Sequence, residues 1–304
     1  MLNDHLKGIL FGLAAYCFWG FVALYWSMLS PVAPPEILIN RVIMGFFSLL
    51  IVLLILRKLN PITEAKKAWS NKKKRLLILA STLIIATNWL VYLYAMTSGR
   101  ILQASFGNYI NPLMTLVFGI VILKEKINRY QVVASLIALG AVVYLTIIQG
   151  YLPWVSLTIA TTFSLYGLIK KLLKMNPIIS LFFEISLMLP VALIFFVNGL
   201  ISGNSAHLRG DPLIVGLLIG AGVMTITPLL LFAKAANSLP LSTVGFLQYV
   251  QPAIQMIVAI FITGEPFSQN TLLAFVFIWI ACLIFSASPF LIKRQQVNVE
   301  EPAI

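Results

Sequence analysis

Two pentapeptides place amide side chains inside strongly apolar stretches of the sequence. NYINP occupies residues 108–112, and QYVQP occupies residues 248–252. On a helix, Asn108 and Asn111 share one face, as do Gln248 and Gln251. A side-chain amide both donates and accepts hydrogen bonds, which suits coordination or gating of a polar solute, and equally suits hydrogen bonding between helices. The residues alone leave both interpretations open.

A proline follows each amide pair by one residue. Pro112 and Pro252 lack a backbone N–H, so each frees a carbonyl about one turn upstream, near Asn108 or Gln248. We therefore predict a kink in each helix, with amide side chains and loosened backbone at the same depth.

Aromatic residues with a polar group recur near the middle of the apolar stretches. We predict that Tyr16, Trp19, Tyr92 and Tyr166, together with Asn88, line a cavity for an amphipathic organic solute. Tyr and Trp also form belts at the membrane interface. Trp26, Trp69 and Trp154 lie near the ends of apolar stretches, and we assign them to such belts.

Two ionisable residues lie inside apolar stretches, where charge is costly. Arg41 could bind an anionic group of a solute, extend to the lipid headgroups, or pair with Glu36. Glu184 is a candidate for carrying a coupled proton, and it could instead pair with Lys170 or Lys171.

The sequence does not carry the motifs of an enzyme, a metal centre or a cofactor site. It contains no H-E-x-x-H, G-x-S-x-G or Walker A pattern, and its two cysteines and two histidines have no metal-ligand spacing. We expect no metal and no cofactor. A membrane-embedded enzyme is a remote alternative, and a channel is a second, although the polar residues are sparse and centred as for a site.

Composition identifies the class of protein. Of the 304 residues, 60% are hydrophobic and 10% are charged, against about 25% charged in soluble domains. A membrane span needs about 20 mostly apolar residues. We predict an all-α integral membrane protein with ten transmembrane helices, near 8–29, 37–56, 76–98, 101–123, 130–149, 152–169, 177–200, 212–234, 241–263 and 271–292.

The basic residues orient these spans. The net charge is +12, and alternate connections together with the two terminal segments hold 18 of the 21 Lys and Arg residues, eight of them in residues 57–75. Positive residues favour the cytoplasmic side of short loops. Both termini are therefore predicted to be cytoplasmic, and the charge needs no nucleic-acid partner.

The second half of the chain is a degenerate copy of the first. At an offset of 140 residues, FGNYINPLMTLVFGIVILKEKI (106–127) aligns with FLQYVQPAIQMIVAIFITGEPF (246–267). Glu125 and Glu265 end equivalent helices, where we expect them to bond loop amides. We predict two five-helix repeats, 1–150 and 151–292, and a short tail, 293–304. An odd number of spans inverts the second copy, as in secondary transporters that work by alternating access.

The chain resembles a known family in several motifs. WG (19–20), EILINR (36–41), YAM (94–96) and NP (111–112) are similar to EamA-type drug/metabolite transporters. NWLVY (88–92), LPWVSLTIATTFSLYGLIKK (152–171), ITPLLLFAKAANSLPLSTVGFLQYVQP (226–252) and GEPFSQNTLLAFVFIWIA (264–281) resemble the RarD branch, labelled as chloramphenicol-sensitivity permeases. One departure is Asn40 before Arg41, where that branch usually has His.

The resemblance implies a carrier for a small organic solute in the bacterial cytoplasmic membrane. Besides the solute and the lipid bilayer we expect no partner, and a monomer or weak homodimer. GILFG (8–12) and GLLIG (216–220) are G-x-x-x-G patterns, for which we expect close helix packing inside one chain.

Overall fold

The described part of the protein is built from helices and short connections. A computed structural model describes residues 4–56, 61–124, 128–209, 211–239 and 247–300. The helices are α1 (Asp4–Ser27), α2 (Pro34–Leu56), α3 (Pro61–Ser70), α4 (Lys72–Thr97), α5 (Ile101–Leu123), α6 (Arg129–Gln149), α7 (Trp154–Leu173), α8 (Pro177–Ile201), α9 (Ala206–Arg209), α10 (Pro212–Ser238), α12 (Val250–Ile257), the π-helical η1 (Val258–Ile262) and α13 (Gln269–Glu300). No strand occurs among these residues.

Eight of the described helices are long and apolar enough to cross a membrane, namely α1, α2, α4, α5, α6, α8, α10 and α13. The protein is therefore a multi-pass membrane protein. The sixth and ninth predicted spans correspond to α7, which has 20 residues, and to the shorter apolar segment Val250–Ile262. The full set of ten spans remains a prediction.

Two boundaries differ from the sequence-based expectation. The basic segment 57–75 contains a short helix, α3, whose first residues include Pro61. The ninth span was expected to run without a break over residues 241–263, but a turn at Gln248 and Tyr249 interrupts it and α12 begins at Val250. Residues 241–246 lie outside the described residues. Pro252 thus lies in the first turn of α12, where its missing N–H has no helical acceptor to lose, and it does not kink the described helix. Pro112 lies inside the continuous helix α5.

Side-chain caps define several helix starts. Asn71, Asn176 and Asp211 accept hydrogen bonds from backbone N–H groups of the first turns of α4, α8 and α10. Asn128 forms a reciprocal capping box with Gln131 at the start of α6. These caps satisfy orphan donors where polar loops meet apolar helices, and so they keep the connections short.

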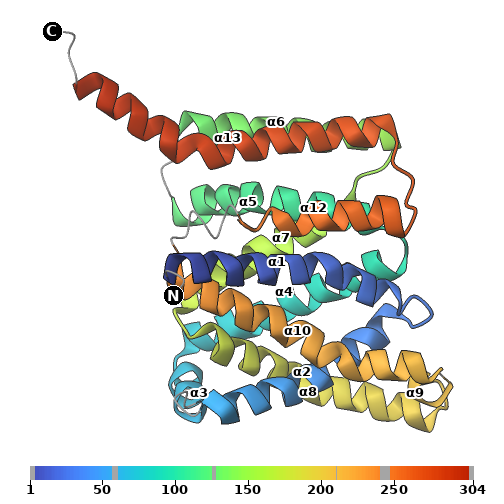
Figure 1. The fold of residues 1–304 in the computed structure, drawn as a ribbon. Coiled ribbons are helices and arrows are strands. Elements are labelled where there is room, and N and C mark those ends of the chain that lie inside the picture. Colours follow the sequence, from blue (N-terminus) through green and yellow to red (C-terminus); the bar gives the residue numbers. More distant parts are fainter. Residues whose placement is uncertain (1–3, 57–60, 125–127, 210, 240–246, 301–304) are drawn as a thin grey trace.

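The helices lie side by side in layers (Figure 1). α6 packs against α13 in one outer layer, α5 and α12 form the next layer, and α2 packs against α8 at the opposite edge. Between them α1 packs on α10 and α12, α7 packs on α4 and α5, and α10 also contacts α2. The start of α1, α3 and the end of α13 lie at one end of the bundle, and α9 lies at the other (Figure 1).

Large apolar side chains are divided between the interior and the outer surface. Trp26, Phe106 and Phe275 are almost fully buried, whereas Leu83 is 71% exposed and Ile147 73% exposed. An exposed apolar belt of this kind is suited to lipid. The glycines of GILFG face into the protein, because a Cβ at Gly8 or Gly12 would meet side chains of Leu239 and Leu247.

Candidate functional site

A central cavity of about 560 Å³ lies between helices of both halves of the chain. Its wall comes from α1, α2, α4, α5, α7, α8, α10 and α12 and from the turn before α12. It includes all ten residues that the sequence analysis proposed for substrate binding or gating: Tyr16, Trp19, Arg41, Asn88, Tyr92, Asn108, Asn111, Tyr166, Gln248 and Gln251. The structure therefore brings these residues together, and their role in binding stays a proposal.

A hydrogen-bonded chain of three side chains joins α5, α12 and α4 beside the cavity. Asn108 Nδ2 donates to Gln255 Oε1 (2.8 Å), and Gln255 Nε2 donates to the Tyr92 hydroxyl (2.6 Å). Gln255 is fully buried. It was not among the ten proposed residues. It follows Gln248 by seven residues and so continues the helical face of Gln248 and Gln251, and this spacing is the signal in the sequence that could have found it.

Two other amides bind neighbouring helices as well as facing the cavity. Asn111 Oδ1 accepts from the Ser164 hydroxyl (2.6 Å), and Asn88 Nδ2 donates to Thr162 Oγ1 (2.8 Å) and to the carbonyl of Ile159 (3.1 Å). These bonds tie α5 and α4 to α7. Both interpretations left open by the sequence, cavity wall and interhelical bonding, therefore apply to the same residues.

Aromatic rings cover one side of the cavity. The ring centroids of Tyr16 and Trp19 are 5.5 Å apart, and both rings contact Phe232 of α10. Trp26 was assigned to an interfacial belt, and that assignment is wrong, because Trp26 is 1% exposed and lines the cavity. It follows Trp19 by seven residues, so helical periodicity places the two indoles on one stripe.

Arg41 lies over two indole rings at the cavity wall. Its Cζ atom is 4.1 Å from the ring centroid of Trp89 and 5.1 Å from that of Trp26. The alternative of pairing with Glu36 does not occur. Glu36 Oε1 instead accepts from the backbone N–H of Ala206 (2.7 Å) and from the Ser205 hydroxyl (3.0 Å), which ties α2 to the start of α9.

The residue that departs from the RarD-like pattern has a partner in the same region. Asn40 is fully buried, its Nδ2 donates to the Glu36 carbonyl (2.9 Å), and its Oδ1 lies 2.7 Å from His207 Nε2. Because Oδ1 accepts, His207 donates from Nε2. Asn40 thus fastens α2 to α9 rather than entering the cavity.

Glu184 lies behind the cavity wall in a hydrogen-bonded ion pair. The carboxylate is fully buried, and it accepts from Lys170 Nζ (2.5 Å), Ser81 Oγ (2.6 Å) and the Tyr166 hydroxyl (2.8 Å). Lys170 Nζ also contacts Ser180 Oγ (2.5 Å). Of the two lysines considered as partners, Lys170 forms the pair, and its side chain lines the cavity where sequence reasoning did not place it.

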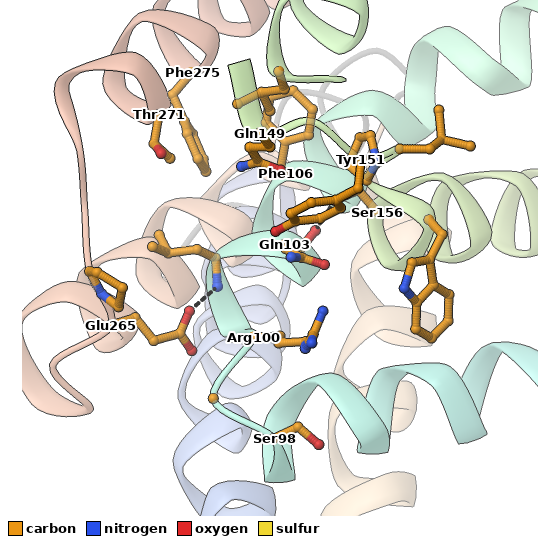
Figure 2. A pocket seen from close by; sticks show the side chains of 17 residues that line it. Ser98, Arg100, Gln103, Phe106, Gln149, Tyr151, Ser156, Glu265, Thr271 and Phe275 are labelled. Atoms are coloured by element: carbon orange, nitrogen blue, oxygen red, sulfur yellow. Dashed lines mark hydrogen bonds between the residues drawn. The ribbon is translucent and has the colours of Figure 1, made fainter. Parts of the chain in front are cut away.

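A second cavity of about 730 Å³ lies at the end of the bundle where α5 and α7 begin. Its wall shares no residue with that of the central cavity. In Figure 2 the side chains of Arg100 and Gln103 extend from the start of α5 into this space, and a dashed line joins that start to Glu265. Arg100 and Gln103 were not proposed from the sequence, and the cavity holds none of the ten candidate residues.

Glu265, in the second half of the chain, caps the N-terminus of α5. Its carboxylate accepts from the backbone N–H groups of Ile101 (2.5 Å) and Leu102 (2.9 Å), which carry the positive end of the helix dipole. Burial raises the pKa of the Glu265 carboxyl, and the two N–H donors oppose part of that rise. Glu265 was expected to bond loop amides, and it instead bonds the first two backbone amides of α5. Glu125 lies outside the described residues.

Comparison with known proteins places this architecture among transporters. The model of the EamA-like transporter family matches residues 6–147 and again residues 152–287. The chain is 37% identical to an uncharacterized transporter, YojE, of Bacillus subtilis (strain 168), over 95% of this chain and 96% of that protein.

Proteins named RarD are also similar to this chain. The Escherichia coli (strain K12) protein is 33% identical over 95% of this chain and 97% of its own length. The Streptomyces exfoliatus protein is 34% identical over 93% and 89%. One crystal structure, only 15% identical, aligns with a TM-score of 0.57 over 95% of this chain and 98% of that one, which shows a shared fold.

Proposed function

Because this chain belongs to the EamA-like transporter family, we propose that it is a secondary carrier that moves a small organic solute by alternating access. The observation that carries the proposal is the central cavity, to which both halves contribute polar and aromatic side chains and in whose wall all ten candidate residues lie. A volume of about 560 Å³ is in the range that holds a small organic molecule.

The packing pattern supports two inverted repeats of five helices. Under the exchange of halves proposed from the sequence, α1–α10 corresponds to α7–α4, and α5–α7 corresponds to α12–α1. All four pairs are in contact. α2 with α8, α5 with α12, and α6 with α13 each pair a helix with its own counterpart. A pseudo-twofold axis relating the halves accounts for this pattern. The family model matches each half once, which agrees with two related halves.

One pair of equivalent contacts is unequal, as alternating access requires. The repeat offset exchanges Asn108 with Gln248 and Gln255 with Thr115. Asn108 is hydrogen-bonded to Gln255, whereas Gln248 and Thr115, both within the described part of the chain, are not hydrogen-bonded to each other. We infer that the end of the α5–α12 contact near the α5 start is closed and that the other end is open.

The extent of the cavity agrees with this inference. Its wall reaches Lys170 and Asn176 at the connection between α7 and α8. By the positive-inside rule this basic connection is cytoplasmic, as are both termini, so we propose an inward-facing state in the cytoplasmic membrane.

Sparse polar groups around one cavity favour a carrier over a channel, whose pore would need a continuous polar lining or charged rings. The test is uptake into vesicles containing the purified protein, using amino acids, amines, aromatic acids and amphenicol drugs. A carrier gives saturable uptake that is accelerated by the same solute on the far side. Linear flux without this acceleration contradicts the proposal and favours a channel.

A further inference from the structure

The central cavity contains one uncompensated positive charge. Among the described residues of its wall, Arg41 and Lys170 are charged, and no Asp or Glu is present. Lys170 is neutralised by Glu184 at 2.5 Å. Arg41 has neither an ion pair nor a hydrogen bond to any described residue, and its Nε atom is buried without a partner.

The surroundings of Arg41 do not replace a counter-charge. Indole rings at 4.1 Å and 5.1 Å attract the guanidinium through their faces, but they accept none of its five N–H donors in the plane of the group. Burying an unpaired charge at membrane depth is costly. Arg41 therefore favours any ligand that brings one negative charge into the cavity.

A second donor lines the same cavity as the guanidinium. The oxygen of the Tyr92 hydroxyl already accepts a hydrogen bond from Gln255 Nε2 at 2.6 Å. The hydroxyl hydrogen therefore remains to donate, and the bond from Gln255, itself bonded to Asn108, polarises it. Guanidinium and phenol together suit the two oxygens of a carboxylate.

We propose that the substrates are organic monoanions, with a carboxylate on Arg41 and Tyr92 and an apolar, aromatic body against the rings of Trp26, Trp89 and Trp19. The inference deepens the proposed function and rests on it, because a bound anion is a substrate only if the protein is a carrier. The net charge of the site sets the charge of the ligand, and the largely apolar remainder of the wall sets the character of its body.

Binding to the purified full-length protein tests the charge first, without any variant. Phenylacetate, phenylacetamide and phenethylamine share one ring and one side-chain length but carry a negative, neutral and positive end. Calorimetry should show tightest binding for phenylacetate, by about tenfold or more over the amide, because an anion gains charged hydrogen bonds. Acetate, which lacks the ring, should bind more weakly than phenylacetate. Equal or tighter binding of the amide or the amine, or no binding of any of the three, overturns the inference.

Variants then test the residue. Arg41→Gln should weaken phenylacetate binding by about ten- to a hundredfold and remove the preference over the amide. Arg41→Lys keeps the charge without the planar fork, so it should retain the preference with reduced affinity. Arg129→Gln removes an exposed cation outside the cavity wall and should change neither. An unaltered preference in a folded Arg41→Gln protein, judged by gel filtration, contradicts the assignment.

Vesicle uptake separates this inference from the proposed function. Saturable uptake of neutral or cationic solutes, unaffected by Arg41→Gln, leaves the carrier standing and refutes the anion specificity. If phenylacetate binding depends on Arg41 but the protein moves no solute, the anion-binding site stands and the carrier function is refuted.

Discussion

Lys170 and Glu184 neutralise each other at the wall of the central cavity, and this pairing changes what a substitution there does. The structure gives the Glu184 carboxylate three donors, so Glu184→Gln leaves the Lys170 ammonium without a counter-charge. The role of Glu184 in carrying a coupled proton remains a proposal.

We predict that Glu184→Gln lowers the free energy of unfolding by about 2 kcal/mol, less than the loss from breaking a fully buried pair, because Lys170 is 21% exposed. The double variant Lys170→Met/Glu184→Gln removes both charges and should recover most of this loss. Thermal unfolding in detergent measures both.

Proton coupling through Glu184 further requires that the pH profile of uptake change in the double variant. An unchanged profile would show that Glu184 does not take part in coupling.

At the scale of elements, close helix contact sets where small residues are needed. A Cβ on Gly222 of α10 would lie 2.3 Å from the carbonyl oxygen of Met44 in α2, which is backbone and cannot rotate away. A Cβ on Gly216, six residues earlier in the same helix, would meet nothing within 4 Å. The two glycines therefore have different roles, although both lie in one apolar helix.

We predict that Gly222→Ala destabilises the protein by about 1–3 kcal/mol through overpacking between α2 and α10. Gly216→Ala, the matched control, should be neutral or stabilising by up to about 1 kcal/mol, because Ala is the better helix former. Unfolding temperatures in detergent compare them. Equal effects of the two substitutions would show that the α2–α10 contact tolerates a methyl group.

At the scale of the whole molecule, equivalent residues of the two halves stand in different environments. Asn108 is bonded across to Gln255, and its counterpart Gln248 faces the cavity without that bond. NYINP and QYVQP are thus proposed to be exchangeable elements of one gate, and the bond from Asn108 to Gln255 is proposed to mark one of its two arrangements. Near-identical elements can exchange states at little net cost.

We predict that Asn108→Ala opens the outer end and Gln248→Ala, the repeat-equivalent substitution, does not. The reporter is a cysteine at Met224, which lines the cavity, in a protein whose Cys17 and Cys282 are replaced by serine. An impermeant thiol reagent should label Asn108→Ala faster from the outer face than the parent. For Gln248→Ala, labelling from the outer face should stay slow. A reporter fusion at residue 65 must first read cytoplasmic to define the faces.

Shifts in the same direction for both variants would contradict a symmetric gate. The amides would then act as bonds between helices, repeated through duplication of the sequence.

The sequence by itself determined the class of protein and the family. Low charge with long apolar stretches requires membrane-spanning helices, and the family model and its relatives confirm the resemblance. Helical spacing placed the ten candidate residues on particular stripes, because periodicity reports which side chains share a face. Trp26 was assigned to an interfacial belt from its position near the end of an apolar stretch alone. That assignment was wrong because it ignored the helical face that Trp26 shares with Trp19.

Only the tertiary structure decided which partner each polar group has. Lys170 rather than Lys171 pairs with Glu184, Asn40 bonds His207, and Arg41 meets two indoles instead of Glu36. The tertiary structure likewise decided the turn before Val250 and the unequal hydrogen bonding of Asn108 and Gln248. These depend on the rotation and depth of one helix against another, which many packed side chains set together and which no local spacing encodes.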